Sequence, residues 1–242
     1  MKNIIEKLTK QQQNIGGTID YLKGLQFAID LLKAEMPLTV EELLESPDTI
    51  TDADGNVYHT VKIGTQTWTV ENLKTTKYND GTAIPLATDG TAWGNLTTPG
   101  YCWYKNDAAT YKTTYGALYN WYAVNTGKLA PTGWHVPTDA EWSTLLAYLG
   151  GSDGKLNDTG TVHWISPNTG ATNKTGFSAL PGGYRNCNGY FDYIGNYGYW
   201  WSATEDNASY ANNRYLNYDS SNLYRDSNFK SCGFSVRLVR DN

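Results

Sequence analysis

The pattern of apolar and polar residues changes near residue 49 of this chain. In residues 4–36, apolar residues recur in alternating steps of four and three, and eight of the ten positions from Ile4 to Met36 are apolar. Such heptad spacing predicts a helical seam that packs against a partner helix. Gly16 and Gly17 interrupt the seam, since an interior glycine costs about 1 kcal/mol relative to alanine, and Thr18 is suited to cap a second helix.

Three arrangements of this N-terminal segment remain open: a helical hairpin, a coiled coil between copies of the chain, or a helical cap on the domain that follows. A further short helix is expected in "PLTVEELLESP", because Thr39 and Glu42 have the capping-box spacing and Pro47 ends it. We therefore expect residues 1–49 to form a helical oligomerisation or attachment segment, with possible homo-oligomers through residues 4–36.

Residues 50–242 show the pattern of short strands separated by turns, as in "VYHTVKIG" and "QTWTVENL". One clear helix is expected in "PTDAEWSTLLAYLGG", where Thr138 and Glu141 form a capping box and Gly150 stops the helix. The rest of this region reads as short strands and long loops. The sequence thus predicts an α+β domain with a loop-heavy second half.

The stretch "ASYANNRYLNYDSSNLYRDSNFKSC", residues 208–232, is crowded with Tyr, Asn, Ser and Asp. If it forms strands, a side-chain period of two points Leu216 and Leu223 inward, and Tyr215, Asn217 and Tyr224 outward. Tyrosine offers stiff, amphipathic contact area, and Ser, Asn and Asp offer adaptable hydrogen bonds, which is the mixture used in antibody loops. The composition indicates a protein-binding face; the alternative is a polar region that only solvates the fold.

Charge and apolar runs exclude several function classes. The formal net charge is −5 and no Lys/Arg block stands out, so nucleic-acid binding is not expected. No stretch approaches the roughly 20 apolar residues of a membrane span, and the N-terminus lacks the apolar run of a signal peptide. We expect a protein without a membrane span that is made in the cytoplasm.

The sequence contains no constellation typical of an enzyme or a metal site. Cys102, Cys187 and Cys232 are scattered, and no Cys/His ligand spacing occurs, so neither a metal nor a cofactor is expected. The three histidines are far apart and lack a carboxylate partner at a telling spacing; His135 is interpreted as a scaffold hydrogen-bonding residue. "DADGN" lacks the later ligands of a calcium loop and is expected to be a hairpin turn. Seven of the nine tryptophans are expected in the core rather than on a sugar-stacking surface: Trp93, Trp103, Trp121, Trp134, Trp142, Trp200 and Trp201.

Residues 52–241 resemble the Fibrobacter succinogenes major paralogous domain family. The resemblance is carried by "DADGNVYHTVKIGTQTWTVENLKTTKYNDGTAIP", "TPGYCWYKNDAATYKTTYGALYNWYAVNTGKL", "PTGWHVPTDAEW", "GFSALPGGYRN", "GYWWSATE" and "GFSVRLVRD". "GWHVPTDAEW" and "GFSVR" are also similar to the formylglycine-generating-enzyme branch of the C-type lectin fold, although the active-site cysteine motif of those enzymes is missing. The resemblance implies a C-type-lectin-like domain whose termini lie close together and whose ligand face precedes the last strands.

Some members of this family are variable proteins of diversity-generating retroelements, in which adenine-directed mutagenesis turns Asn codons into a restricted set of residues. Between Asp206 and Cys232 only Lys230 falls outside that set. The resemblance therefore implies a hypervariable region over about 184–232 in a non-enzymatic receptor-binding or ligand-binding protein of the phage tail adhesin kind. The ligand-binding residues expected on this face are Asn186, Asn188, Tyr190, Asp192, Tyr193, Asn196, Tyr197, Tyr199, Asp206, Asn207, Ser209, Tyr210, Asn213, Tyr215, Asn217, Tyr218, Asp219, Ser220, Asn222, Tyr224, Asp226, Ser227, Asn228, Phe229, Ser231 and Cys232.

The partner implied by this resemblance is a host-surface protein or another macromolecular ligand, and the implied location is the virion, with the cell surface as the alternative. The alternative function is a non-diversified structural or carbohydrate-binding module of a bacterial surface. Leu129 and Leu238 stand where relatives commonly have cysteines, which the family pattern suggests are disulfide-bonded in exported members. An apolar contact could replace that bond here, which fits assembly in a reducing cytoplasm.

Overall fold

The computed structural model describes residues 49–241 of the 242-residue chain. They belong to one compact unit that begins at Thr49. The predicted N-terminal helices lie outside the described residues, so the segment boundary near residue 49 and oligomerisation through residues 4–36 stay predictions. Helices and sheets are mixed within the described unit, which agrees with the predicted α+β class.

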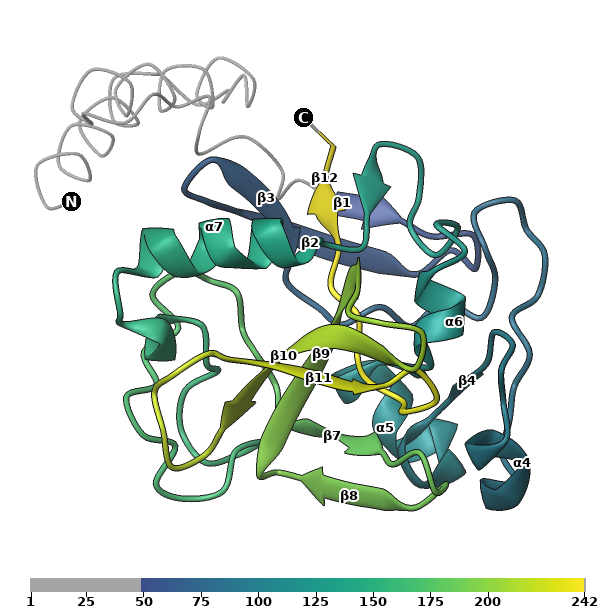
Figure 1. Ribbon diagram of the computed structural model, residues 1–242. Coiled ribbons are helices and arrows are strands. Elements are labelled where there is room, and N and C mark those ends of the chain that lie inside the picture. The colour runs from purple at the N-terminus through teal and green to yellow at the C-terminus, as the bar shows by residue number, and fades with distance from the viewer. Residues whose placement is uncertain (1–48, 242) are drawn as a thin grey trace, which may run out of the picture. The chain divides into compact units, whose positions relative to one another are not determined.

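A five-stranded sheet contains both the first and the last strand of the described chain (Figure 1). Its strands run in the order β1-β2-β3-β12-β6, and every neighbouring pair is antiparallel. The strands are β1 (Thr49–Thr51), β2 (Val57–Ile63), β3 (Gln66–Thr69), β6 (Trp134–His135) and β12 (Val239–Arg240).

The "DADGN" segment forms the hairpin turn between β1 and β2, as predicted. The Asp52 carboxylate accepts hydrogen bonds from the backbone N–H groups of Asp54 and Asn56, each at 2.9 Å. Gly55 has φ +83°, a conformation that glycine adopts without steric cost. The Asp54 carboxylate is bound to Thr76, so both acidic side chains of this turn are used to hold the chain in place.

A second five-stranded sheet is built from the C-terminal half of the chain, in the order β11-β10-β9-β7-β8. Only the β7–β9 pairing is parallel. The polar stretch 208–232 therefore forms two regular strands, an arrangement that the sequence left open within a loop-heavy second half. The reason is the alternation of Tyr215 and Asn217 with the buried Arg214 and Leu216, which suits a half-buried strand. The strands are β7 (Gly182–Arg185), β8 (Phe191–Ile194), β9 (Tyr197–Glu205), β10 (Tyr210–Asn217) and β11 (Tyr224–Phe229).

Helix α7 (Asp139–Leu149) is the helix that the sequence predicts. Thr138 and Glu141 form the capping box, and Gly150 takes the left-handed conformation that ends the helix. The structure also contains short helices, turns and strands that the sequence did not predict. They are α4 (Gly90–Gly94), α5 (Ala108–Tyr115), α6 (Trp121–Val124), the 3-10 turns η1 (Tyr104–Asn106) and η2 (Asp153–Lys155), and the two-stranded ladder of β4 (Tyr101–Cys102) and β5 (Leu118–Tyr119).

Two large apolar clusters form the core, one on each face of the second sheet. Trp200 and Trp201 are consecutive in β9 and therefore point to opposite faces. Trp201 belongs to a cluster with Tyr119, Trp121 and Phe234, whereas Trp200 belongs to a cluster with Trp68, Trp142 and Trp164. Of the seven tryptophans predicted to lie in the core, six are buried and Trp134 is half-buried; Trp68 and Trp164 are buried as well. Leu129 and Leu238 are both buried in the cluster around Trp201.

The closing segment "GFSVRLVRD" is mostly irregular. Only Val239–Arg240 is regular, and the residues before it are held by isolated bridges such as Tyr119↔Phe234 and Trp200↔Ser235. The buried Arg237 fixes this course. Its guanidinium donates to the Asn72 side chain at 2.7 Å and to the carbonyl oxygens of Thr69, Val70, Phe177 and Ser178.

Candidate binding face

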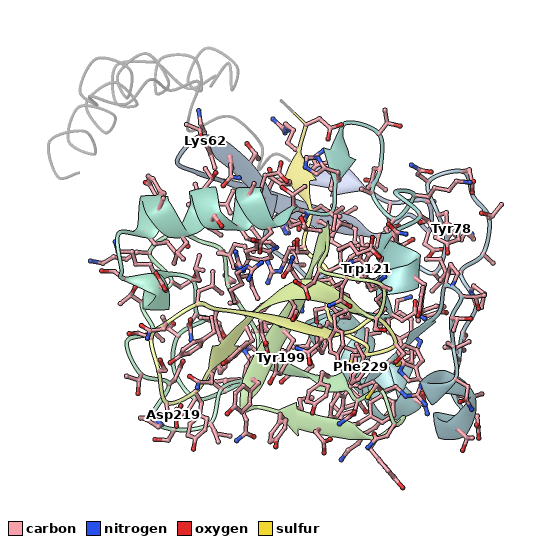
Figure 2. The ribbon with its side chains drawn as sticks, in the orientation of Figure 1. Lys62, Tyr78, Trp121, Tyr199, Asp219 and Phe229 are labelled. Atoms are coloured by element: carbon pink, nitrogen blue, oxygen red, sulfur yellow. The ribbon has the colours of Figure 1, made fainter. Side chains whose placement is uncertain are left out.

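One face of the second sheet carries six tyrosines, with at least one from each of its five strands. We call this set the tyrosine row. Figure 2 shows its member Tyr199 between Asp219, at one end of the β10–β11 hairpin, and Phe229, at the other. The row consists of Tyr184 on β7, Tyr193 on β8, Tyr197 and Tyr199 on β9, Tyr215 on β10 and Tyr224 on β11.

The six rings form three stacked pairs. Tyr215 and Tyr224 have centroids 4.9 Å apart and planes 16° from parallel. The pairs Tyr197–Tyr199 and Tyr184–Tyr193 lie at 5.7 and 5.8 Å, each with planes 20° apart. The strand register causes the first of these contacts, because Tyr215 is directly opposite Tyr224.

Further ring contacts join the stacked pairs into one continuous row. Tyr199 lies 5.4 Å from Tyr215, its partner in the β9–β10 register, and 5.1 Å from Tyr184. Tyr193 lies 5.1 Å from Tyr197. A row of mutually packed rings holds each ring in one orientation, so it offers preorganised contact area.

The row has a buried floor and an exposed outer side. Tyr199 and Tyr184 pack on Phe234, with ring centroids 5.0 and 5.8 Å from that of Phe234. The ring centroids of Phe234 and Trp201 are 4.3 Å apart. At the outer side, Tyr193 is 52 % exposed. The inner tyrosines therefore anchor the row to the core.

Tyr184, Tyr199 and Tyr215 keep their phenol protons at neutral pH, because burial raises their pKa values. Burial raises the pKa of Tyr184 to about 12 and raises the pKa values of Tyr199 and Tyr215 above the usual value. A protonated phenol both donates and accepts hydrogen bonds. These hydroxyl groups can therefore act toward a ligand both as hydrogen-bond donors and as hydrogen-bond acceptors.

Tyr193 joins the row through an unusual backbone conformation. In a regular strand its side chain would share the side of Phe191, two residues before it. Its φ of +63° is uncommon for a residue with a bulky side chain and costs on the order of 1–3 kcal/mol. In this conformation the ring stacks on Tyr184 instead.

Polar side chains surround the row. The Ser220 hydroxyl and the Tyr224 hydroxyl are 2.9 Å apart, and the Asn186 amide donates to the Tyr184 hydroxyl at 3.4 Å. Asp192 is directly opposite Tyr184 in the β7–β8 register. The face therefore combines aromatic area with adaptable hydrogen-bonding groups, as the composition predicted.

The other face of β10 and β11 is fixed to helix α7. Arg214 and Arg225 are opposite one another in register, and both bind the Asp139 carboxylate, at 2.9 and 3.0 Å. Leu216 and Leu223 are buried, as the period of two predicted. Two ion pairs and apolar packing on the opposite face therefore hold the backbone that carries the row.

The remaining predicted ligand-binding residues occupy several places around the row. Tyr218 packs against the cluster around Trp200, and Tyr210 forms a second aromatic pair with Phe229, at 4.4 Å. Tyr190 is 71 % exposed. Exposed positions also include Asn188, Asp206, Asn207, Ser209, Asp219, Asn222, Asp226 and Phe229, and half-buried ones include Asn186, Asp192, Asn196, Tyr210, Asn217, Ser220, Ser227, Asn228 and Ser231.

Two predicted face residues, Asn213 and Cys232, are buried, which corrects their assignment to an exposed surface. The Asn213 side chain accepts a hydrogen bond from Asn228 at 2.9 Å, beneath the surface. Cys232 lies in the core cluster around Trp201, with Cys187 packed against it. Burial raises the pKa of the Cys232 thiol to about 12, so this cysteine behaves as a core thiol.

Sequence reasoning missed Tyr184 as a member of the row. Tyr184 lies on β7, which pairs with β9 through the parallel contact Gly183↔Gly198, although β8 lies between these two strands in the sequence. The alternation of Tyr184 with the buried Arg185 in "GGYRN" is the one available signal, since it points the two side chains to opposite faces.

Each histidine has a carboxylate partner in the fold, which corrects the expectation drawn from their spacing. His59 lies 2.6 Å from Glu71, and His163 lies 2.8 Å from Asp158. His135 lies 2.5 Å from Asp241 and 2.7 Å from Glu141, so it links β6 to α7 and to the end of the chain, as a scaffold residue. Among residues 49–241, no group of three or more His, Cys, Asp or Glu side chains is placed to hold a metal ion.

Comparisons with known proteins place the chain by its sequence. The family model described as the Fibrobacter succinogenes major domain matches residues 61–240. Neither the curated proteins nor the solved structures gave a match to this chain. Within the part of the chain that the structure describes, no helix has the length and apolar character needed to cross a membrane.

Proposed function

Because the chain belongs to the Fibrobacter succinogenes major domain family, we propose that it is a non-enzymatic binding protein that recognises a macromolecular ligand through the tyrosine row. The observation that carries this proposal is the continuous packing of six tyrosines on one face of a sheet whose other face is fixed to the core. Rigid tyrosines supply contact area at low entropic cost, and the neighbouring Asn, Ser and Asp side chains supply hydrogen bonds.

The proposed fold of this unit is C-type-lectin-like, in the formylglycine-generating-enzyme-like branch. Two features support it. Strands β1 and β12 lie in the same sheet, so the described chain begins and ends close together. The candidate face comes from β7 to β11, which precede the last strand.

We further propose that residues of about 184–232 are the hypervariable region of a diversity-generating-retroelement variable protein, and that this protein is a receptor-binding protein of the phage tail adhesin kind. The division of β10 into two faces supports this. Tyr215 and Asn217 face the surface and are of types that adenine-directed mutagenesis produces, whereas Arg214 and Leu216 hold the scaffold. Substitution on the outward positions would change the ligand and leave the fold intact.

The same residues would serve a non-diversified structural or carbohydrate-binding module of a bacterial surface. Sugar stacking needs an open ring face. In the three stacked pairs, each ring covers one face of its partner, which leaves less open ring face than a sugar platform offers. Binding of the full chain to a glycan array, with loss of binding in Tyr215→Ser, would favour this alternative.

The genomic neighbourhood of the coding sequence tests the diversification. The proposal expects a near-copy of the 3′ end that differs at adenines, next to a reverse-transcriptase gene. The mismatched adenines should fall in the codons of outward residues such as Tyr197, Tyr215 and Tyr224, and not in those of Trp200, Arg214 or Leu216. Absence of such a copy would contradict diversification and leave the surface-module alternative.

A selection experiment tests binding directly. A library of the full chain would vary Tyr197, Tyr215 and Tyr224 among Tyr, Asn, Ser and Asp and be selected against several unrelated purified proteins. A matched library would vary three exposed positions away from the second sheet: Lys62, Asp80 and Lys128. Specific binders from the first library and none from the second support the proposal, whereas equal yields contradict it.

A further inference from the structure

The basic side chains of residues 182–234 are not directed to the tyrosine row. Arg185 is buried and donates to the carbonyl oxygens of Ala87, Thr88 and Gly189. Arg214 and Arg225 bind Asp139 on the opposite face of the sheet. The ammonium group of Lys230 is bound to Glu205 and lies over the ring of Trp121, and the residue is only 6 % exposed.

Two carboxylates, in contrast, lie on the side of the row. Asp192 is opposite Tyr184 in register, and Asp226 is two residues after Tyr224 and therefore on the same side of β11. Burial is the larger cause of the raised pKa values of Tyr184 and Tyr215, and the charges of Asp192 and Asp226, respectively, raise them further. Within residues 49–241, the Lys and Arg ion pairs involve carboxylates other than these two.

The stacked rings add hydrogen-bond acceptors to this negative charge. Stacking turns the ring faces toward each other, so hydroxyl groups and ring edges remain for a ligand. Guanidinium and ammonium groups carry donors and no acceptor. Guanidinium and ammonium groups are therefore complementary, in hydrogen bonding and in charge, to phenol oxygens that lie between two carboxylates.

Resting on the proposed function, we infer that the partner of the tyrosine row is a basic protein surface, whose Arg or Lys side chains bind between the tyrosine hydroxyls and the carboxylates of Asp192 and Asp226. Charge complementarity of this kind speeds association and excludes acidic partners. Strands β8 and β11 are four strand positions apart, which corresponds to about 19 Å at the usual spacing of about 4.8 Å. A partner with two basic side chains at that separation engages both carboxylates.

A short peptide with two arginines provides the probe. The peptide acetyl-Arg-Ser-Gly-Ser-Gly-Ser-Arg-amide separates its arginines by about 20 Å when extended. One control peptide has citrulline in place of arginine, which keeps the shape and part of the N–H donors, exchanges the others for a carbonyl oxygen and removes the charge, and a second has glutamate. Each peptide is titrated into the isotope-labelled full chain, and amide chemical shifts report which residues it contacts.

The arginine peptide is expected to shift the amides of Tyr215, Tyr224 and Asp226. Its affinity should fall roughly three- to tenfold between about 0.05 M and about 0.5 M salt, since exposed charges are screened. The Asp192→Asn/Asp226→Asn double variant should lose most of the binding. The control Asp80→Asn removes an exposed carboxylate that pairs with Lys128 and should bind as the wild type does.

Three results would overturn the inference: equal shifts with the citrulline peptide, stronger shifts with the glutamate peptide, or no shifts at the row with any of the three peptides. The first two leave the tyrosine row as a binding face and remove only the basic partner. The third also removes the basic partner, while the library selection above judges the proposed function independently of charge.

Discussion

The ring of Tyr215 on β10 lies 4.9 Å from the ring of Tyr224 on β11, with planes 16° apart. Neither side chain belongs to an apolar core cluster, although the neighbouring Tyr199 packs against one. This pair therefore separates the contribution of the tyrosine row to ligand binding from its contribution to stability.

We expect Tyr215→Ser and Tyr224→Ser each to change the free energy of unfolding by about 1 kcal/mol or less. In a double-mutant cycle the pair should show a coupling of about 0.5–1.5 kcal/mol, as for other stacked aromatic pairs. The core control Trp201→Ala should cost about 3–5 kcal/mol. Urea unfolding of the full chain measures the wild type, the two single variants, the double variant and the Trp201 variant. Single serine variants as unstable as the Trp201 variant would contradict the surface assignment.

Tyr193 allows a direct test of backbone strain. Because its φ is +63°, glycine fits this position without a steric penalty and alanine does not. We expect Tyr193→Gly to be more stable than Tyr193→Ala by about 1–2 kcal/mol, the reverse of the order in a regular strand. Thermal unfolding compares the stabilities of the two variants. An alanine variant more stable than the glycine variant would refute the assigned conformation.

The buried Arg237 is expected to be essential for folding. Arg237→Met would leave the carbonyl oxygens of Thr69, Phe177 and Ser178 without their donor. An unsatisfied buried polar group costs about 1–3 kcal/mol, so the variant should lose at least about 3 kcal/mol or fail to fold. Lys62→Met, at an exposed position of β2, is the control and should remain near wild type. Circular dichroism melting distinguishes the two, and a folded Arg237→Met with wild-type stability would be a contrary result.

His135 makes stability depend on pH. Burial opposes its protonation, but the hydrogen bonds to Asp241 and Glu141 outweigh burial and hold its pKa above the usual 6.5. Since the pKa is raised in the folded state, this contribution is complete below about pH 6.5 and disappears as the pH rises through the folded value. The melting-temperature difference between wild type and His135→Gln should therefore shrink from about pH 6 to about pH 9. A difference that does not vary with pH would argue against the link.

Thiol reactivity should follow burial. Burial raises the pKa values of Cys102 and Cys232 to about 12, so few of these thiols are ionised at neutral pH. Cys187 is half-buried and donates to the Asn186 side chain at 3.2 Å. Iodoacetamide should modify Cys187 first in the native chain, and all three thiols after unfolding, as intact-mass spectrometry would show. Early labelling of Cys232 would contradict its burial.

Local sequence signals predicted the features that depend on a few adjacent residues. The capping box of Thr138 and Glu141 identified helix α7, and the alternation around Leu216 identified the inward face of β10. Helix α5 gave no such signal because it has no buried residue, so no apolar stripe marks it. Its cap, the Asp107 side chain, is a weak indication by itself.

The tyrosine row was only partly predictable because its order depends on strand pairing. The sequence indicates that Tyr215 and Tyr224 face outward, but not that β9 lies between β10 and β7. The membership of Tyr184 follows from that arrangement. The positive φ of Tyr193 has no local signal either, because the residue is not a glycine. Arg237 is similar, since its acceptors come from segments far away in the chain.

The shared carboxylate of Asp139 has a further consequence for how this surface can be modified. A shift of β10 by one residue would turn Arg214 and Leu216 outward and leave Asp139 with Arg225 alone, so the strand register is strongly fixed. Changes at Tyr215 or Tyr224 then alter the chemistry of the surface while the backbone keeps its position. The second sheet could therefore serve as an engineering scaffold. The affinities of variants with different surface side chains could be compared directly, because their backbone structure stays the same.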